Sequence, residues 1–132
     1  MGNGKQSVYG LQMLNIINNY YYESMKDKLH NTIVGIIRDD IKKAFDNLSN
    51  NQKIWIKRHL DAPHIVDVSL DINQFKTIQV WQITKNDIDE KSPNVISYNP
   101  ATHNYGIITE LSSGVRWYMG DYGSFVDAYM AL

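Results

Sequence analysis

The spacing of apolar residues in the first half of the chain predicts helices. Over residues 7–22 and again over 25–48, apolar residues recur every three or four positions, which places them on one face of a helix. The segment 49–52, Ser-Asn-Asn-Gln, has the form of a capping box, in which Ser and Gln side chains bond free backbone amides at a helix start. A third helix is therefore expected there. It should end by about Asp61, because Pro63 cannot donate a helical hydrogen bond and disfavours helical backbone before it.

After Pro63 the period of the apolar positions shortens from 3.6 residues to two, which indicates β-structure with one solvent-exposed face. Runs rich in β-branched and aromatic residues, separated by turn residues, predict five strands. Gly120 to Gly123 interrupt the pattern, and Ser124 with Asp127 three residues later predicts a capped, short closing helix. The predicted strands are 66–72, 75–84, 95–98, 105–111 and 115–119.

Helices first, strands second and one helix last is the element order of an α+β fold. We expect N-terminal helices packed on one face of an antiparallel meander sheet of about five strands, followed by a short C-terminal helix. A length of 132 residues suits one domain, and neither a repeat nor a linker divides the chain. The prediction is a single α+β domain over 1–132, with residues 1–6 as a flexible leader.

Composition and charge narrow the classes of partner. The chain has 13 Lys and Arg against 14 Asp and Glu, so it lacks the basic excess that favours nucleic-acid or anionic-membrane binding. It has no Cys, which excludes disulfides, thiolate nucleophiles and sulfur-ligated zinc. No apolar run reaches the roughly 18 residues that cross a bilayer, and the first residues lack the apolar core of a secretory signal. We therefore expect a cytoplasmic protein that binds neither nucleic acid nor membrane.

Candidate catalytic groups are sparse. His59, Asp61 and His64 are the one compact group with ligands that suit zinc or iron, but histidines five apart across a proline do not share a helix face. His59 is better explained near a helix carboxyl end, where a charged imidazole interacts favourably with the dipole. Ser124 lacks the Gly-x-Ser-x-Gly elbow of hydrolases, and no phosphate-binding or calcium loop is present. We predict no catalytic residue, no metal and no cofactor.

Charge and aromatic residues favour recognition of a protein. Nine basic and six acidic residues lie in 1–63, against four basic and eight acidic residues in 64–132. Alternation along a strand puts Arg116 and Tyr118 on one face, and Tyr and Arg often dominate interfaces. At least one ring of residues 20–22, Tyr-Tyr-Tyr, should reach the surface, because successive helical residues turn by roughly 100°. The alternative is that the rings only fill the core. The predicted partner-binding residues are Asp67, Asp71, Asp87, Asp89, Glu90, Arg116 and Tyr118.

The carboxyl-terminal stretch resembles the tail of small bacterial toxin-immunity proteins. Residues 114–119, Gly-Val-Arg-Trp-Tyr-Met, lead through 120–123, Gly-Asp-Tyr-Gly, into 124–130, Ser-Phe-Val-Asp-Ala-Tyr-Met. In SUKH-like and contact-dependent-inhibition immunity proteins, a last strand with an aromatic residue commonly precedes such a Ser-Phe helix. The amino-terminal Leu-Pro and Gly-pair motif of SUKH proteins is absent. The resemblance implies a non-catalytic protein that neutralises a toxin domain by occluding its active site.

Three functions stay open at this stage. The first is a protein-binding domain, with an immunity protein that binds a basic toxin domain as the favoured form. The second is a small NTF2-like enzyme or ligand-binding protein, cone-shaped and α+β, with a pocket between helices and sheet. The third is a structural or phage-type assembly subunit, for which an exposed aromatic patch would mark a self-association surface. The pocket of an NTF2-like protein would be lined by residues such as His64, Trp81, Tyr105 and Trp117.

Overall fold

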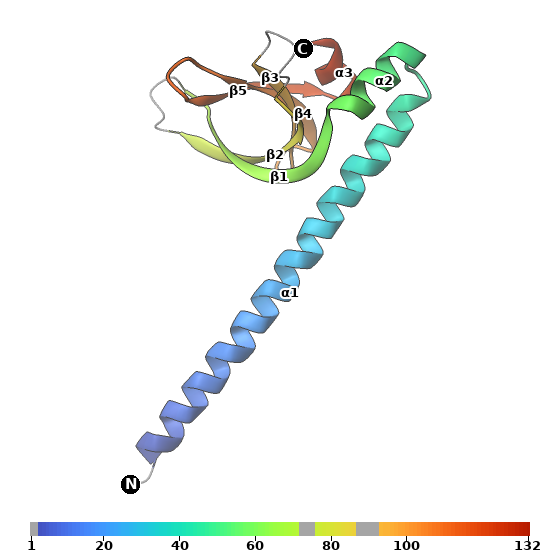
Figure 1. Cartoon of the computed structure of the whole chain (residues 1–132). Helices are drawn as coiled ribbons and strands as arrows, with labels where there is room; N and C mark the ends of the chain where they lie inside the picture. The colour runs from blue at the N-terminus through green and yellow to red at the C-terminus, as the bar shows by residue number, and fades with distance from the viewer. Residues whose placement is uncertain (1–2, 72–75, 87–92) are drawn as a thin grey trace. The chain divides into compact units, whose positions relative to one another are not determined.

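The structure of the chain is a computed structural model that describes residues 3–71, 76–86 and 93–132, without the side chains of residues 3–9. The chain divides into two compact units, an amino-terminal unit of residues 1–36 and a barrel unit of residues 37–132. The class is α+β, as predicted. The elements are α1 (Asn3–Phe45), α2 (Asn50–His59), β1 (Leu60–Ser69), β2 (Thr77–Thr84), β3 (Asn94–Asn99), β4 (Asn104–Glu110), β5 (Arg116–Gly123) and α3 (Phe125–Met130), labelled in Figure 1.

A single helix, α1, replaces the two helices predicted over 7–22 and 25–48. Glu23 and Ser24, which separate the two predicted segments, are neither Pro nor Gly, so nothing there interrupts the backbone hydrogen bonds. The last turn carries Lys42 and Lys43, whose positive charge interacts favourably with the negative end of the helix dipole. The apolar spacing predicted the helical state correctly but divided the helix in two.

Both predicted capping boxes are present. The Ser49 Oγ accepts a hydrogen bond from the Gln52 backbone N–H at 3.2 Å, and the Gln52 Oε1 accepts one from the Ser49 backbone N–H at 2.8 Å. The Ser124 Oγ likewise accepts from the Asp127 backbone N–H at 3.2 Å, and the Asp127 Oδ2 accepts from the Ser124 backbone N–H at 3.0 Å. These bonds satisfy amides that would otherwise lack partners at the starts of α2 and α3.

Of the five strands, β1 and β5 extend furthest beyond their predicted bounds. β1 begins at Leu60, directly after α2, so Pro63 lies within a strand at a register shift between Leu60 and His64. A bulge is one of the few places where a strand accepts proline. β5 continues to Gly123, through the residues predicted to end it. Gly120 and Gly123 have φ of 116° and 101°, which suits glycine; the strand continues past Gly120 and ends at Gly123.

The five strands form a closed barrel, which corrects the expectation of an open antiparallel meander (Figure 1). The four sequential pairs are antiparallel, as a meander requires. The barrel closes through a parallel pairing of β1 with β5 at Ser69 and Trp117. Because the sheet closes on itself, its inner face is filled by its own side chains, and helices can cover only the outer face.

Two apolar layers stabilise the barrel unit. The inner layer fills the barrel with Val66, Val68, Val80, Val95, Ile108 and Tyr118, against which Ile78 packs. Alternation along the strands turns the neighbouring residues outward, where Trp81, Ile96, Tyr98, Tyr105 and Ile107 are also buried. α3 contacts β3, β4 and β5, so it covers part of this outer layer. In the described part of the chain, no helix is long and apolar enough to cross a membrane.

Candidate functional site

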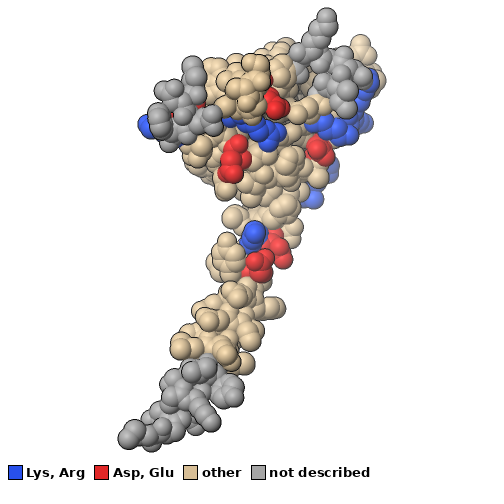
Figure 2. Space-filling view, turned by 60° about the vertical axis from the view of Figure 1, so that its left-hand side comes forward, with Lys and Arg blue, Asp and Glu red and all other residues tan. Residues whose placement is uncertain are grey.

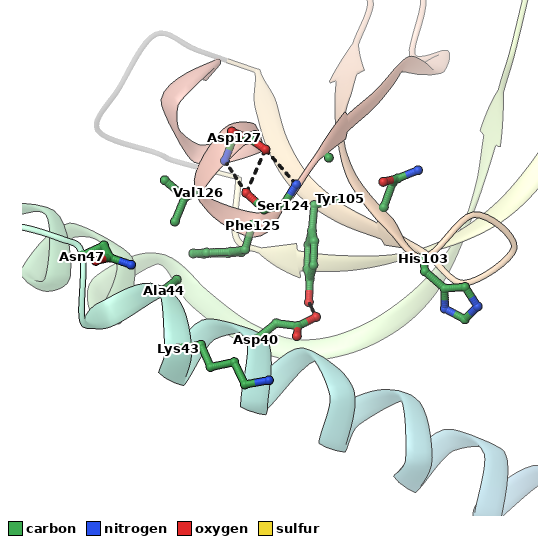
Figure 3. Close-up of a pocket in the computed structure, with 12 residues that line it drawn as sticks. Asp40, Lys43, Ala44, Asn47, His103, Tyr105, Ser124, Phe125, Val126 and Asp127 are labelled. Atoms are coloured by element: carbon green, nitrogen blue, oxygen red, sulfur yellow. Dashed lines mark hydrogen bonds between the residues drawn. The ribbon is translucent and has the colours of Figure 1, made fainter.

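A cavity of about 660 Å³ lies in the barrel unit, where the end of α1, the start of β4 and the start of α3 meet (Figure 3). Its volume falls in the range of about 300–1,000 Å³ that is typical of small-molecule sites. The lining mixes charged, amide and apolar side chains. It consists of Asp40, Lys43, Ala44, Asn47, His103, Asn104, Tyr105, Gly123, Ser124, Phe125, Val126 and Asp127.

Tyr105 links β4 to α1 at one wall of the cavity. Its Oη donates a hydrogen bond of 2.7 Å to the Asp40 Oδ2, and Figure 3 shows the ring pointing toward that carboxylate. Only 2% of Tyr105 is exposed. Burial raises the pKa of the Tyr105 phenol, and the hydrogen bond to Asp40 and the Asp40 charge raise it further. The phenol therefore stays protonated and acts as a permanent donor to Asp40.

Aromatic rings continue from Tyr105 in both directions. The Tyr98 ring lies 5.1 Å from that of Tyr105, and the Phe125 ring lies 5.7 Å away and nearly perpendicular, an edge-to-face contact. Tyr98 Oη and His103 Nδ1 are 3.1 Å apart, which holds the turn between β3 and β4 against the rings. Burial raises the pKa of Tyr98, and the charge of Asp40 adds to the effect. This wall of the cavity is therefore packed and preorganised.

Ser124 and Asp127 also line the cavity and cap α3. The Ser124 Oγ donates to the Asp127 Oδ2 at 2.9 Å, in addition to the two capping bonds. The backbone and side-chain hydrogen bonds from Ser124 lower the pKa of the Asp127 carboxyl. Because the Ser124 hydroxyl bonds a helix-capping carboxylate and no imidazole, it is a cap, as predicted, without the base that would activate a nucleophile.

Arg116 and Tyr118 share one face of β5, as predicted, but this face lines the barrel interior. The Arg116 Nη2 donates to the Oε1 of buried Gln82, and the Tyr118 Oη donates to the Asp121 Oδ1. Tyr118 is 6% exposed and belongs to the inner apolar layer. Its ring therefore offers no outer surface to a partner, and Met119 is the exposed residue beside it.

The phenol of Tyr118 and the carboxyl of Asp121 affect each other's ionisation. Burial raises the pKa of Tyr118, and the hydrogen bond to Asp121 adds to the rise. Burial also acts to raise the pKa of Asp121, but hydrogen bonds from Tyr118, Thr102, Asn99 and Asn104 outweigh it and leave that pKa below its ordinary value. The pair stays in its neutral phenol and ionised carboxylate forms around neutral pH, which is a structural arrangement and not an acid–base pair poised near pH 7.

The structure describes two of the five acidic residues that were predicted to bind a basic partner. Asp67 is exposed on β1, and Asp71 is half-buried just after that strand. Asp87, Asp89 and Glu90 lie outside the described residues. Figure 2 shows acidic and basic side chains interspersed on the face in view, without a large patch of one sign. Steering of a basic partner by this surface stays a prediction.

The histidines near Pro63 are bonded to backbone carbonyl groups. The His59 Nδ1 lies 2.7 Å from the Trp55 carbonyl oxygen, and the His59 ring stacks on that of Trp55 with 3.9 Å between centroids. The His64 Nδ1 lies 3.0 Å from the Ala62 carbonyl oxygen. Among the described residues, no group of three His, Cys, Asp or Glu side chains is placed to hold a metal ion.

The cavity shares one residue with the pocket expected of an NTF2-like protein. Of the four residues predicted to line a pocket, the cavity contains Tyr105 but not His64, Trp81 or Trp117. Asp40 and Lys43, which lie three positions apart on α1, and His103, which lies after β3, also line it; they were missed because nothing in the sequence places His103 beside that helix face. Lys43 supplies an ammonium group to the lining, and the His103 Nδ1 lies 3.1 Å from the Tyr98 hydroxyl. Among the lining residues, the Ser124 hydroxyl is hydrogen-bonded to the helix-capping carboxylate of Asp127 and not to an imidazole.

The amino-terminal unit carries a second feature, an apolar surface on α1. Ten large apolar side chains there are 45–72% exposed, and all three rings of residues 20–22 are among them. We call this set the α1 surface. It consists of Leu11, Met13, Leu14, Ile16, Ile17, Tyr20, Tyr21, Tyr22, Met25 and Leu29.

Comparisons with known proteins add no assignment to these two features. No protein-family model, no curated protein and no solved structure matches the chain.

Proposed function

We propose that the chain is a non-catalytic protein-binding domain that binds through the α1 surface. The observation that carries this proposal is the exposure of ten large apolar side chains between residues 11 and 29. Contiguous exposed apolar patches beyond a few hundred Å² mark interaction sites in soluble proteins. The three tyrosines alone offer roughly 300–500 Å², given about 150–250 Å² for a whole aromatic side chain and their two-thirds exposure. The α1 surface therefore exceeds what scattered surface apolar residues explain.

The state of the ionisable groups in the cavity supports binding over catalysis. Asp40 accepts from Tyr105, and Asp127 accepts from Ser124, so both carboxylates already have structural bonds. A general base needs a pKa near the working pH and reach to a substrate proton. The Asp127 pKa is lowered by its bonds, which makes this carboxylate a weaker base.

The test compares two double variants with matched chemistry. Ile16→Glu with Met25→Glu, the α1 variant, changes side chains that are 62% and 69% exposed; Ile54→Glu with Met130→Glu, the control variant, changes side chains that are 63% and 66% exposed in the barrel unit. Each protein is crosslinked in lysate of its native host, and the products are identified by mass spectrometry. We expect crosslinked partners with the wild type and the control variant, and about tenfold less with the α1 variant, since buried charges oppose association. Equal crosslinking of all three proteins would contradict the proposal.

Toxin immunity is a second candidate function. What supports it is the arrangement at the carboxyl end, where β5 with its Trp117 leads directly into the Ser124-capped α3. This is the arrangement on which the resemblance to immunity proteins rests. The test is to express the product of the neighbouring reading frame with and without this chain. Rescue of growth by the chain would support immunity, and a neighbouring product that is harmless, or whose toxicity persists, would contradict it.

A further inference from the structure

We infer that the partner of the α1 surface is the same segment of further copies of this chain, assembled into a bundle of more than two helices. This inference rests on the proposed function, because it names the partner of the same surface. Four properties of the segment carry it: its charge, the distribution of its apolar side chains, its amides and its area.

The distribution of charge in this segment permits identical copies to associate. Residues 6–22 contain no charged side chain, and the next turns carry two acids, Glu23 and Asp27, and two bases, Lys26 and Lys28. In Figure 2 this part of α1 is accordingly tan between the grey end and the first coloured residues. Identical copies therefore approach without like-charge repulsion, which in other interfaces suppresses wrong pairings. A strongly basic or acidic partner would find no complementary charge over residues 6–22.

The apolar side chains lie on opposite faces of α1. Leu11, Leu14, Asn18, Tyr21 and Met25 follow each other by alternating steps of three and four, the seam spacing of a coiled coil. The opposite face has the same kind of spacing at residues 13, 16 and 20, which are Met, Ile and Tyr. A pair of helices would bury one face and leave the other exposed. The polar remainder of the circumference holds residues 12, 15, 19, 23 and 26, which are Gln, Asn, Asn, Glu and Lys. An apolar arc wider than one face is buried only by more than one neighbour, which a bundle of more than two copies provides.

Asparagine amides supply the polar contacts of such a bundle. Asn18 lies in the seam itself and Asn15 lies beside it, whereas Asn19 lies on the polar stripe of the helix. An amide both donates and accepts, so the same side chain on another copy is a complete partner. A single Asn in the seam of a coiled coil fixes register and oligomeric state at some cost in stability. The segment thus carries a means of aligning identical copies.

The area is sufficient for a stable assembly. With about 100 Å² for a whole aliphatic side chain and about 200 Å² for an aromatic one, the α1 surface exposes roughly 700–900 Å² on each copy. Stable interfaces bury about 800 Å² on each partner. A lipid surface is the weaker alternative, because helices that lie on membranes carry Lys and Arg on their polar face, and residues 6–22 have none.

Sedimentation equilibrium of the full chain tests the inference over about a hundredfold range of concentration. We expect the wild type and the control variant to form the same assembly of more than two copies. The α1 variant should dissociate at a concentration at least about tenfold higher, because it places glutamates in an apolar interface. The near-ultraviolet circular dichroism of the barrel aromatics serves as the check that all three proteins are folded.

Other results of these measurements would overturn the bundle alone or the bundle together with the proposed function. A wild type that is monomeric or strictly dimeric overturns the bundle, as does equal dissociation of the α1 and control variants. A monomer that binds phosphatidylcholine vesicles through the α1 surface assigns that surface to lipid and overturns both proposals. A monomer that still crosslinks to a different protein, with loss in the α1 variant, overturns self-assembly and leaves the proposed function intact.

Discussion

The Tyr105 hydroxyl joins two segments that are 65 positions apart by one hydrogen bond to Asp40. A hydrogen bond to a charged group contributes about 1.5–3 kcal/mol when buried, and the half-buried carboxylate here reduces that to about 1–2 kcal/mol. Tyr105→Phe should therefore lower the free energy of unfolding by about 1–2 kcal/mol, measured by urea denaturation. Tyr122→Phe, at a 38% exposed ring, is the control and should change it by less than about 0.5 kcal/mol. Equal effects would show that the bond to Asp40 adds nothing.

The same phenol makes stability depend on pH. Burial raises the pKa of Tyr105, with the bond to Asp40 and its charge adding to the rise, whereas the unfolded phenol titrates near its ordinary pKa of about 10. The folded state thus holds the proton more tightly, so this contribution is complete below pH about 10 and is lost as the pH rises above it. We expect the free energy of unfolding to fall more steeply above that pH in the wild type than in Tyr105→Phe. Parallel pH profiles would contradict the assignment.

Sequence reasoning worked at residues whose partners are local. Ser49 and Ser124 were identified as caps because each bonds a residue three positions away. The hydrogen bond from Tyr105 to Asp40 has no local signature, so it was not predictable, and of the residues expected to line a pocket only Tyr105 lies in the cavity. Tyr118 is an intermediate case. Alternation along β5 correctly paired it with Arg116, but alternation does not say which face of a strand points inward.

At the scale of elements, the pairing of β4 with β5 depends on Gly106. A Cβ atom at this position would overlap the Gly120 carbonyl oxygen and the Tyr118 ring. The carbonyl belongs to the neighbouring strand, so it cannot move without disturbing the pairing. Gly106→Ala should therefore lower the free energy of unfolding by about 1–3 kcal/mol, measured by urea denaturation.

The control for this substitution has the opposite expected sign. Gly10 lies in α1 with nothing within 4 Å of an added Cβ. Gly10→Ala should increase the helical circular dichroism signal, because alanine is favoured over glycine in a helix by about 1 kcal/mol. Destabilisation of the barrel unit by both substitutions, or by neither, would contradict the role given to Gly106.

The elements themselves were predictable to different degrees. Alternation identified the first strand, and runs of β-branched and aromatic residues between turn residues identified the other four, since both are local properties of the sequence. Barrel closure was missed because it depends on the pairing of Ser69 with Trp117, two residues whose local sequences are compatible with an open edge. The continuity of α1 was missed for a different reason: its apolar positions drift around the helix, and a drifting stripe resembles two separate amphipathic helices.

At the scale of the whole molecule, the two units differ in what stabilises them. The barrel unit has an inner and an outer apolar layer. Residues 10–22 of the amino-terminal unit contain Gly, Asn, Ile and Tyr, which are weaker helix formers than Ala or Leu. Most helical stability in proteins comes from packing of an apolar face and not from propensity. The helix of the amino-terminal unit should therefore depend on the assembly inferred above.

This difference predicts two unfolding transitions followed by far-ultraviolet circular dichroism. The first should remove helical signal and shift to higher temperature as protein concentration increases, because association stabilises only the assembled state. The second, from the barrel unit, should not move with concentration. In the α1 variant the first transition should shift to a lower temperature or disappear, while the second is unchanged. A single transition that is independent of concentration in the wild type would instead mean that residues 1–132 unfold as the one cooperative domain that the chain length predicts, and that the helix needs no second copy.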